Sequence, residues 1–352
     1  MTGKGVLIQG VLAALGLGAV YSTWQREPDR APGEATVLNL GKKDLQGIHY
    51  DDDQTTVDLF AQGQTPDGAP EVWVKVLEKK APPKTPGAPE SPTAPAVAKE
   101  FRGDESARRM WADFAPWHSP RAFGALDDAK AKELGIDDAS AKKKLSVNAS
   151  GQTFSFVLGQ PAAHGSGETY LRDVQNGHVY LATRQLVGDL QGAAHRLVDR
   201  RLFAFKQGDF DKLTVSANGK TRALVVVNRL DPVALKLAPA SAPDKPEDML
   251  KTWHDKVWRL SPVEVLGKGV EPTEGSPKID LRVEYFDRSK SLGWVEIAHI
   301  EKADLVSSGP AKAPGSAGSS VLFARSSHTA GWVRLPFDPV LLADGEKVAS
   351  GS

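Results

Sequence analysis

The sequence WADFAPWHSP at residues 111–120 returns as WHDKVWRLSP at residues 253–262, and the two share the pattern W-x-D-x5-S-P. Each copy follows a proline-rich loop and an acidic helix start, GDESARRM in the first case and KPEDMLKT in the second. The dipole of a helix N-terminus favours acidic residues at such positions. Because similarity at a wide interval is the signature of an internal repeat, the two segments predict equivalent helices in a duplicated fold.

Two more pairs of segments occur in the same order along the chain. Residues 42–60 and 207–226 each contain an Asp, a short strand, a polar turn and a second strand, which predicts a hairpin in both. Residues 170–190 and 322–342 each contain an apolar pair, an Arg, a short turn and then Gly-x-V-x-L. Chance similarity would not preserve this order, so we interpret the chain as two copies of one module.

The expected strands alternate apolar and polar residues, as in TFSFVL (153–158) and IDLRVEYF (279–286). This alternation predicts antiparallel sheets with one face in water. The sequence therefore predicts an α+β fold of two tandem, internally repeated modules with mainly antiparallel sheets, at residues 35–200 and 201–348. The first module contains a loop at residues 81–98 with a proline at every third position, as in a polyproline helix.

The composition limits the classes of function. A chain of 352 residues is long enough for two domains. Lys plus Arg and Asp plus Glu both number 44, so the formal net charge is zero. We expect no nucleic-acid partner, because such partners are bound by strongly basic surfaces. The absence of Cys excludes disulfides, thiolate metal sites and a Cys nucleophile.

The N-terminal stretch GVLIQGVLAALGLGAVYSTW at residues 5–24 carries no charged side chain. A helix of this length covers about 30 Å, the thickness of the bilayer hydrocarbon core. We therefore predict a transmembrane helix at residues 5–24, preceded by a short cytoplasmic end at residues 1–4. The alternative is a cleaved signal peptide. The uncleaved anchor is favoured because the apolar run exceeds the roughly 7–15 residues of a signal core and no small-x-small cleavage site follows it.

The lipid bilayer is thus one expected partner. Aromatic residues at the end of the span suit the membrane interface, and small residues along it allow another helix to pack closely. The charges on the two sides of the span are nearly balanced, so charge alone leaves the membrane orientation open. The residues predicted to anchor and pack the helix are Gly10, Ala14, Gly18, Tyr21 and Trp24.

Segments that resemble chemical motifs are better explained by structure. Asp51, Asp52 and Asp53 lie between two apolar segments, which indicates a solvated hairpin turn rather than a cation site. The segment AAHGSGETY (162–170) lacks the strand–elbow–helix context of a catalytic serine. The 8 His residues show no HExxH or His-x-His spacing, so no metal site is predicted.

No Walker A motif and no dinucleotide fingerprint occurs, so any energy would have to come from a partner. Trp residues recur at matched points of the two copies, which favours packed cores over stacking on sugars. These residues are Trp111, Trp117, Trp253, Trp258, Trp294 and Trp332. We therefore predict no catalytic, cofactor-binding or metal-binding residues and no cofactor, and we expect that the protein is not an enzyme.

The segment HRLVDRRLFAF at residues 195–205 concentrates cationic side chains near the middle of the chain. Apolar residues up to this point have helical spacing, which predicts a helix with its arginines in solvent and cations in its last turn. The following LFAF is expected to begin the strands of the second module. We predict that the cluster is a joint between the modules rather than a ligand site, formed by Arg196, Asp199, Arg200 and Arg201.

The region around this joint resembles a bacterial family of unknown function that is associated with gliding-motility-type ABC transporters. The similar parts are an LGID turn at residues 134–137, a hairpin that ends in LGQ, a YLR…VYL hairpin, and the exit LVDRRLF that leads to an Asp and a strand. The resemblance covers most of residues 100–230 and is carried by structural motifs. It implies a membrane-anchored periplasmic protein encoded beside, or fused to, the auxiliary subunit of such a transporter, with no catalytic residues to carry over.

Together, the residues and the resemblance predict a non-catalytic, single-pass protein of the bacterial inner membrane with its C-terminal region in the periplasm. Its expected partners are integral-membrane permease or auxiliary subunits of an ABC-transporter-type complex and, through them, a cytoplasmic ATPase. A single span and no second apolar segment favour an accessory subunit over a permease component. The alternative is an envelope glycan-binding or processing protein whose site no motif reports.

Removal of residues 1–24 is expected to leave a soluble, folded protein, because each predicted module has a core of its own. Urea unfolding followed by circular dichroism should give a cooperative transition. Aggregation, or melting without cooperativity, would contradict the two-module interpretation.

Overall fold

The computed structural model describes residues 33–65, 68–79, 98–139, 141–162, 167–229, 231, 234–301 and 320–351. The predicted membrane helix lies outside this part of the chain, as do its packing and anchoring residues Gly10, Ala14, Gly18, Tyr21 and Trp24. The prolines of the loop at residues 81–98 also lie outside it. Within the described ranges, no helix is long and apolar enough to cross a membrane.

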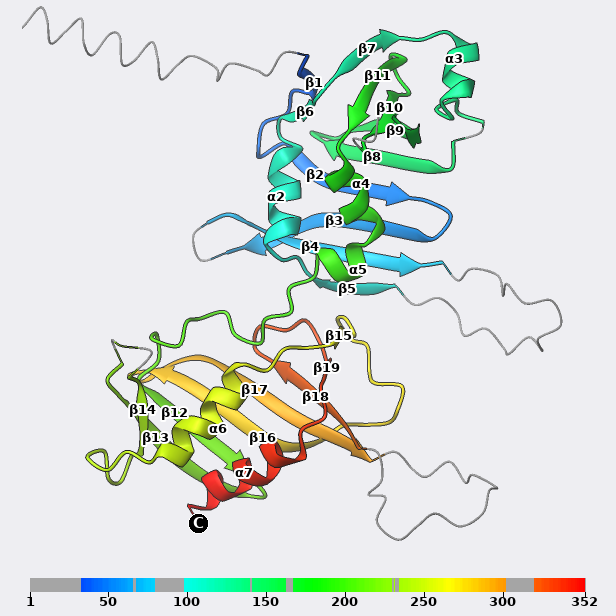
Figure 1. Cartoon of the computed structure of the whole chain (residues 1–352). Coiled ribbons are helices and arrows are strands. Elements are labelled where there is room, and N and C mark those ends of the chain that lie inside the picture. Colours follow the sequence, from blue (N-terminus) through cyan, green and yellow to red (C-terminus); the bar gives the residue numbers. More distant parts are fainter. Residues whose placement is uncertain are drawn as a thin grey trace, which may run out of the picture. The chain divides into compact units, whose positions relative to one another are not determined.

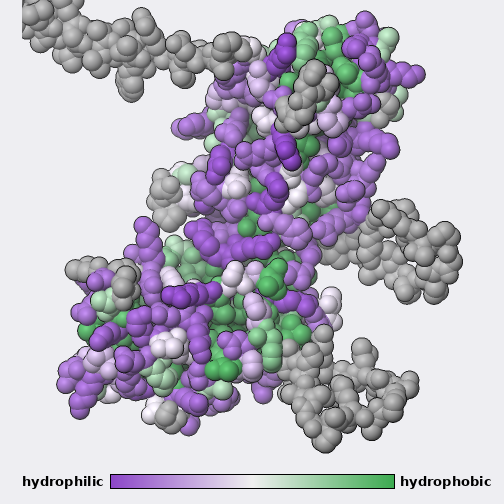
Figure 2. Space-filling view, in the orientation of Figure 1, coloured by the Kyte–Doolittle hydropathy of each residue, from purple (hydrophilic) through white to green (hydrophobic). Residues whose placement is uncertain are grey.

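The fold is mixed α+β with mainly antiparallel sheets and few helices, which confirms the predicted class at this level. The chain divides into two compact units. The first unit consists of Met1–Leu45 and Ala112–Val187, and the second of Gln46–Trp111 and Gly188–Ser352. The module boundary at residue 200 stays a prediction. Figure 2 shows that hydrophilic residues cover most of the visible surface, while hydrophobic residues reach it in separate patches.

The first unit is built on a run of antiparallel strands with α3 (Asp128–Glu133) beside it. The strand order is β8 (Lys143–Ala149), β9 (Gln152–Pro161), β10 (Thr169–Asp173), β11 (His178–Ala182) and β7 (Ala122–Ala125). A separate pair joins β1 (Ala35–Leu38) and β6 (Trp117–Ser119). Ala131 of α3 and Ile136 of the LGID turn pack with Val157 and Val179 of the strands.

One part of the second unit contains the first predicted hairpin. Its strands run in the order β5 (Lys99–Arg102), β4 (Pro70–Glu78), β3 (Thr55–Gln64) and β2 (Leu45–Asp51), and α2 (Glu105–Asp113) follows β5. The Asp turn lies between β2 and β3 as predicted, but it is not simply solvated. Asp52 is buried and accepts hydrogen bonds from the Thr55 amide at 2.7 Å and the Tyr50 hydroxyl at 2.8 Å, while Asp51 pairs with Lys79 at 2.6 Å.

The other part of the second unit is an eight-stranded antiparallel sheet with α6 (Asp248–Trp258) and α7 (Pro339–Ser350) on one face (Figure 1). The strand order is β14 (Lys236–Pro239), β13 (Lys220–Val227), β12 (Lys212–Ala217), β16 (Lys278–Asp287), β17 (Lys290–Glu301), β18 (Ser320–Ser326), β19 (Val333–Leu335) and β15 (Glu264–Val265). Inward-facing strand residues such as Val283, Val295 and Val333 form one core with Trp253 of α6 and Leu341 of α7.

Local sequence explains both helices on this sheet. Leu250, Trp253 and Val257 recur at helical spacing and are all buried, so they give α6 its core-facing side. The helix α7 begins where the Asp338 carboxylate accepts hydrogen bonds from the backbone amides of the first turn. The absence of a side chain at Gly345 allows α7 close to the sheet, because a Cβ there would lie 3.0 Å from the Leu281 side chain.

The predicted core role of Trp is confirmed for four residues and partly for two. Trp111, Trp117, Trp253 and Trp332 are buried. Trp258 and Trp294 are only partly buried. The prediction that LFAF begins a strand is wrong: the first strand after it starts at Lys212. Its Phe203 ring instead stacks on Trp258 at a centroid distance of 4.4 Å, in an aromatic cluster that includes Tyr285.

The predicted helix around residue 195 is two short helices. The helix α4 (Arg184–Gln191) ends before Gly192, and α5 (Ala193–Arg196) begins after it. His195 and Arg196 occupy the last turn of α5, where cations complement the helix dipole, as predicted.

His254 of α6 provides a test of this core through pH. Its ring is completely buried among Phe210, Trp258 and Tyr285, and neither ring nitrogen has a hydrogen-bond partner in the described chain. Burial lowers the pKa of His254 from 6.5 to about 4. Between these pH values the unfolded chain binds the extra proton, so the free energy of unfolding falls as pH is lowered.

The loss attributable to His254 should total about 3 kcal/mol by pH 4. Urea unfolding of the wild type and of His254→Leu from pH 7 to pH 4.5 would measure it, and the variant should lose much less stability over this range. An unchanged pH dependence in His254→Leu would show that other groups control acid stability.

Candidate functional site

A charged groove in the second unit is the strongest candidate site. It consists of two adjoining hollows, of about 480 and 720 Å³, which share Glu105, Arg108, Asp199 and Arg201. The first hollow adds Glu71, Arg102 and His328, and the second adds Asp104, His195, Arg200 and Ser261. We call this surface the Asp199 groove.

Backbone hydrogen bonds place Asp199 beside the end of β5. The Asp199 amide donates to the Arg102 carbonyl at 2.9 Å, and the Asp104 amide donates to the Leu197 carbonyl at 3.0 Å. Gly103 makes this approach possible, because a Cβ there would lie 2.7 Å from the Ala107 side chain and 2.9 Å from the Val72 carbonyl. Next to it, the Asp104 carboxylate caps α2 by accepting from the Ala107 amide at 3.0 Å.

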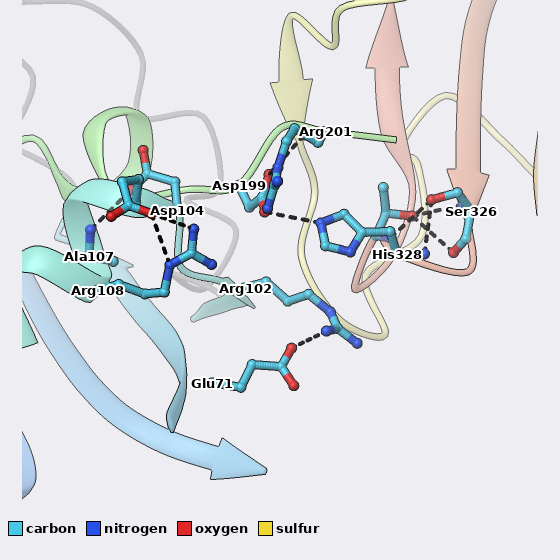
Figure 3. Close-up of polar contacts among 11 residues, drawn as sticks. Glu71, Arg102, Asp104, Ala107, Arg108, Asp199, Arg201, Ser326 and His328 are labelled. Atoms are coloured by element: carbon cyan, nitrogen blue, oxygen red, sulfur yellow. Dashed lines mark hydrogen bonds and ion pairs between the residues drawn. The ribbon is translucent and has the colours of Figure 1, made fainter. Parts of the chain in front are cut away.

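The Asp199 carboxylate is the centre of the groove (Figure 3). Its side chain is only 4% exposed. It accepts hydrogen bonds from Arg201 Nη2 at 2.6 Å and from Arg201 Nε at 3.0 Å, and it pairs with His328 Nε2 at 3.0 Å. Burial acts to raise its pKa, but the hydrogen bonds with His328 and Arg201 outweigh burial and hold the pKa of Asp199 well below its usual value. Asp199 is therefore an ionised anchor for two cationic or proton-donating side chains.

Two further ion pairs flank this centre. Arg102 of β5 pairs with Glu71 of β4, and Arg108 of α2 pairs with Glu105 at 2.8 Å, one turn earlier. The Arg102 guanidinium also lies over the Trp73 ring, 5.3 Å from its centroid. Burial raises the pKa of Asp104, and the nearby negative charge of Asp199 adds to this effect. Paired charges thus keep the side chains of the first hollow in fixed positions.

The second hollow is different because two of its basic residues make no ion pair within the described part of the chain. Arg200 and His195 line it, and neither makes a side-chain hydrogen bond or ion pair within the described residues. Arg200 is partly exposed and His195 is exposed. At this end of the groove, hydrogen-bond donors that no described side chain occupies therefore face solvent.

The four residues predicted as a joint separate into two groups. Asp199, Arg200 and Arg201 line the groove, whereas Arg196 pairs with Asp189 of α4 at 2.9 Å. Sequence reasoning missed His328, which follows β18 and lies 129 residues from Asp199 along the chain. It also missed Glu71, Arg102 and Arg108. No spacing rule connects such distant residues, although His328 lies within a segment that the repeat had already drawn attention to.

No protein-family model, curated protein or solved structure matches the chain. Among the described residues, no group of three or more His, Cys, Asp or Glu side chains could hold a metal ion. What the groove can do chemically follows from its donors: it offers guanidinium and imidazole groups at one end and a rigid set of ion pairs at the other.

The substitution Asp199→Asn tests the role of the central carboxylate. It should lower the free energy of unfolding by about 2 kcal/mol, since it removes charge-assisted hydrogen bonds at a buried position. Urea unfolding of the full chain in mild detergent would measure the loss.

Glu105→Gln is the matched control, because Glu105 is 73% exposed and its ion pair among the described residues is with Arg108 of the same helix. It should leave the unfolding midpoint unchanged. Equal effects of the two substitutions would contradict a central role for Asp199.

Proposed function

We propose that the protein is a non-catalytic, single-pass accessory subunit of an ABC-transporter-type complex of the bacterial envelope, and that the Asp199 groove binds a partner subunit. The apolar stretch at residues 5–24 supports the membrane anchor. The resemblance of residues 100–230 to a family associated with gliding-motility-type transporters supports the class of complex. A periplasmic location of the described residues follows from these two points and is part of the proposal.

The proposal includes duplication of one module, which the strand orders support. The run β4-β3-β2 corresponds to β14-β13-β12, and the run β8-β9-β10-β11-β7 corresponds to β16-β17-β18-β19-β15. The helices are placed similarly, since α2 follows β5 and α6 follows β14, and each of these strands lies at an edge of its sheet. Two unrelated sequences would have no reason to share this non-sequential order.

The observation that carries the partner-binding role is the composition of the groove. Its fixed ion pairs give a rigid surface, so that few side chains need to be ordered when a partner binds. The Arg200 guanidinium and the His195 imidazole, which are unpaired among the described residues, can donate hydrogen bonds to acidic side chains of a partner. A groove with this pattern suits an acidic segment of a neighbouring subunit.

A photoreactive amino acid placed at position 200 of the full-length protein tests this proposal in native membranes. Crosslinks to an integral-membrane transporter subunit are expected, and mass spectrometry would identify the product. The control is the same amino acid at position 220, because Lys220 is the exposed first residue of β13 and lies outside the groove residues.

Charge reversal gives an independent readout. Arg200→Glu should abolish co-purification of the partner, because an acidic segment would meet a like charge, whereas Lys220→Glu should retain it. Co-purification that survives Arg200→Glu, or crosslinks of equal yield from positions 200 and 220, would rule out the groove as the docking surface.

A further inference from the structure

A third hollow, of about 280 Å³, lies on the sheet of the second unit. It shares no lining residue with the Asp199 groove, although its Ser326 and Thr329 flank the groove residues Ser327 and His328. It is lined by Trp294 of β17, Arg325 of β18, the loop that ends at Trp332, and Gly269–Glu271 of the loop before β16. Val295 and Ile297 point into the core with α6 and α7, so Trp294 and Glu296, which alternate with them, point to the opposite face. The hollow is therefore on the face that these two helices do not cover.

A buried carboxylate fixes the arginine of this hollow. Arg282, Glu296 and Arg325 lie directly opposite one another on the adjacent strands β16, β17 and β18. Glu296 is 8% exposed and accepts hydrogen bonds from Arg282 Nη1 at 2.6 Å and from Arg325 Nε at 2.7 Å. The Arg325 guanidinium also lies 4.7 Å from the centroid of the Trp332 ring. With Nε held by Glu296, the terminal nitrogens of Arg325 keep their donors for another group.

The other side of the hollow provides a carboxylate. Glu271 is exposed and makes no hydrogen bond or ion pair within the described residues. Trp294 is partly exposed, and the Arg282 guanidinium lies 4.7 Å from the centroid of its ring. The hollow thus combines a fixed donor, a free acceptor and an indole whose other face lies under Arg282. The two positive charges of Arg282 and Arg325 balance the two negative charges of Glu296 and Glu271.

We propose that this hollow binds a neutral saccharide ring. A pyranose has an apolar face of C–H groups, which the negative face of an indole attracts, and a rim of hydroxyls that both donate and accept hydrogen bonds. The hollow offers both kinds of partner, with no net charge to select an ion. Its volume of about 280 Å³ is just below the roughly 300–1,000 Å³ of small-molecule pockets, which suits a single ring of a longer chain. This site is independent of the partner-binding groove.

Tryptophan fluorescence of the full-length protein, purified in a detergent without a sugar headgroup, tests the proposal. The probes are maltotriose and the trimer of N-acetylglucosamine, with glycine as a zwitterionic comparison. A saturable change with at least one of the saccharides, and none with glycine, is expected. The absence of saturation with both saccharides, or saturation with glycine alone, would overturn the proposal.

Substitutions locate the binding site. Glu271→Gln should weaken saccharide binding about tenfold, because it replaces a charged acceptor by a neutral one. Trp294→Leu should remove most of the fluorescence change and of the binding measured by calorimetry. The matched control is Glu346→Gln, since Glu346 is an exposed carboxylate of α7 on the other face of the sheet. Glu271→Gln removes no contact within the described chain, so its folding should be intact. Equal affinity of Glu271→Gln and Glu346→Gln would place the saccharide elsewhere.

Discussion

A carboxylate that has lost almost all contact with water must be paired, and this constraint applies to Asp199, whose side chain is 4% exposed. Its pairing determines the positions of Arg201 and His328, and its backbone joins the end of β5. Such a buried pair adds less to net stability than its short distances suggest, because removing charges from water offsets the attraction. Its main effect is on geometry. The side chains around Asp199 can pair with it in one arrangement only, and this makes the groove rigid.

The eight-stranded sheet illustrates how a two-residue period assigns different roles to its two faces. One face buries Val283, Val295 and Val333 against α6 and α7. On the other face, the Arg282–Glu296–Arg325 row and Trp294 alternate with these apolar residues. A polar row of this kind is sufficient for an exposed sheet face, since opposite charges on adjacent strands stabilise each other. The row can also bind a ligand, because the terminal nitrogens of Arg325 border the hollow and keep donors that the sheet does not use.

The sequence predicts elements well where the pattern is local. The hairpins at residues 42–60 and 207–226 and the acidic starts of α2 and α6 follow from local patterns, and the burial of Trp111 and Trp253 follows from their recurrence at matched points of the repeat. The sequence predicts local structure poorly where contacts with distant residues determine it. LFAF has the composition of a strand, but Phe203 gains more from stacking on Trp258. The Asp turn has the composition of an exposed loop, but the hydroxyl of Tyr50 makes burial of Asp52 possible.

Strand register was equally beyond local patterns. The shared Gly-x-V-x-L aligns Val179 with Val333, yet Val179 packs with Ile136 and Val157, whereas Val333 belongs to the cluster of Trp253. Because a shift of one residue moves a side chain to the other face of a sheet, residues that match in sequence need not have similar environments. The candidate site has the same difficulty: Asp199 and Arg201 are neighbours in sequence, but His328 meets them only through the fold.

The two W-x-D-x5-S-P segments show how equivalent sequence positions can acquire different roles. In the first, Ser119 is buried, and its hydroxyl bonds the Leu181 carbonyl at 2.8 Å and accepts from the Leu181 amide at 3.1 Å. In the second, Ser261 is exposed and lines the Asp199 groove. A hydroxyl committed to the backbone cannot bind anything else, whereas an exposed one can. Positions that match in the repeat thus have different contacts, which is why the repeat indicates the fold but not the site.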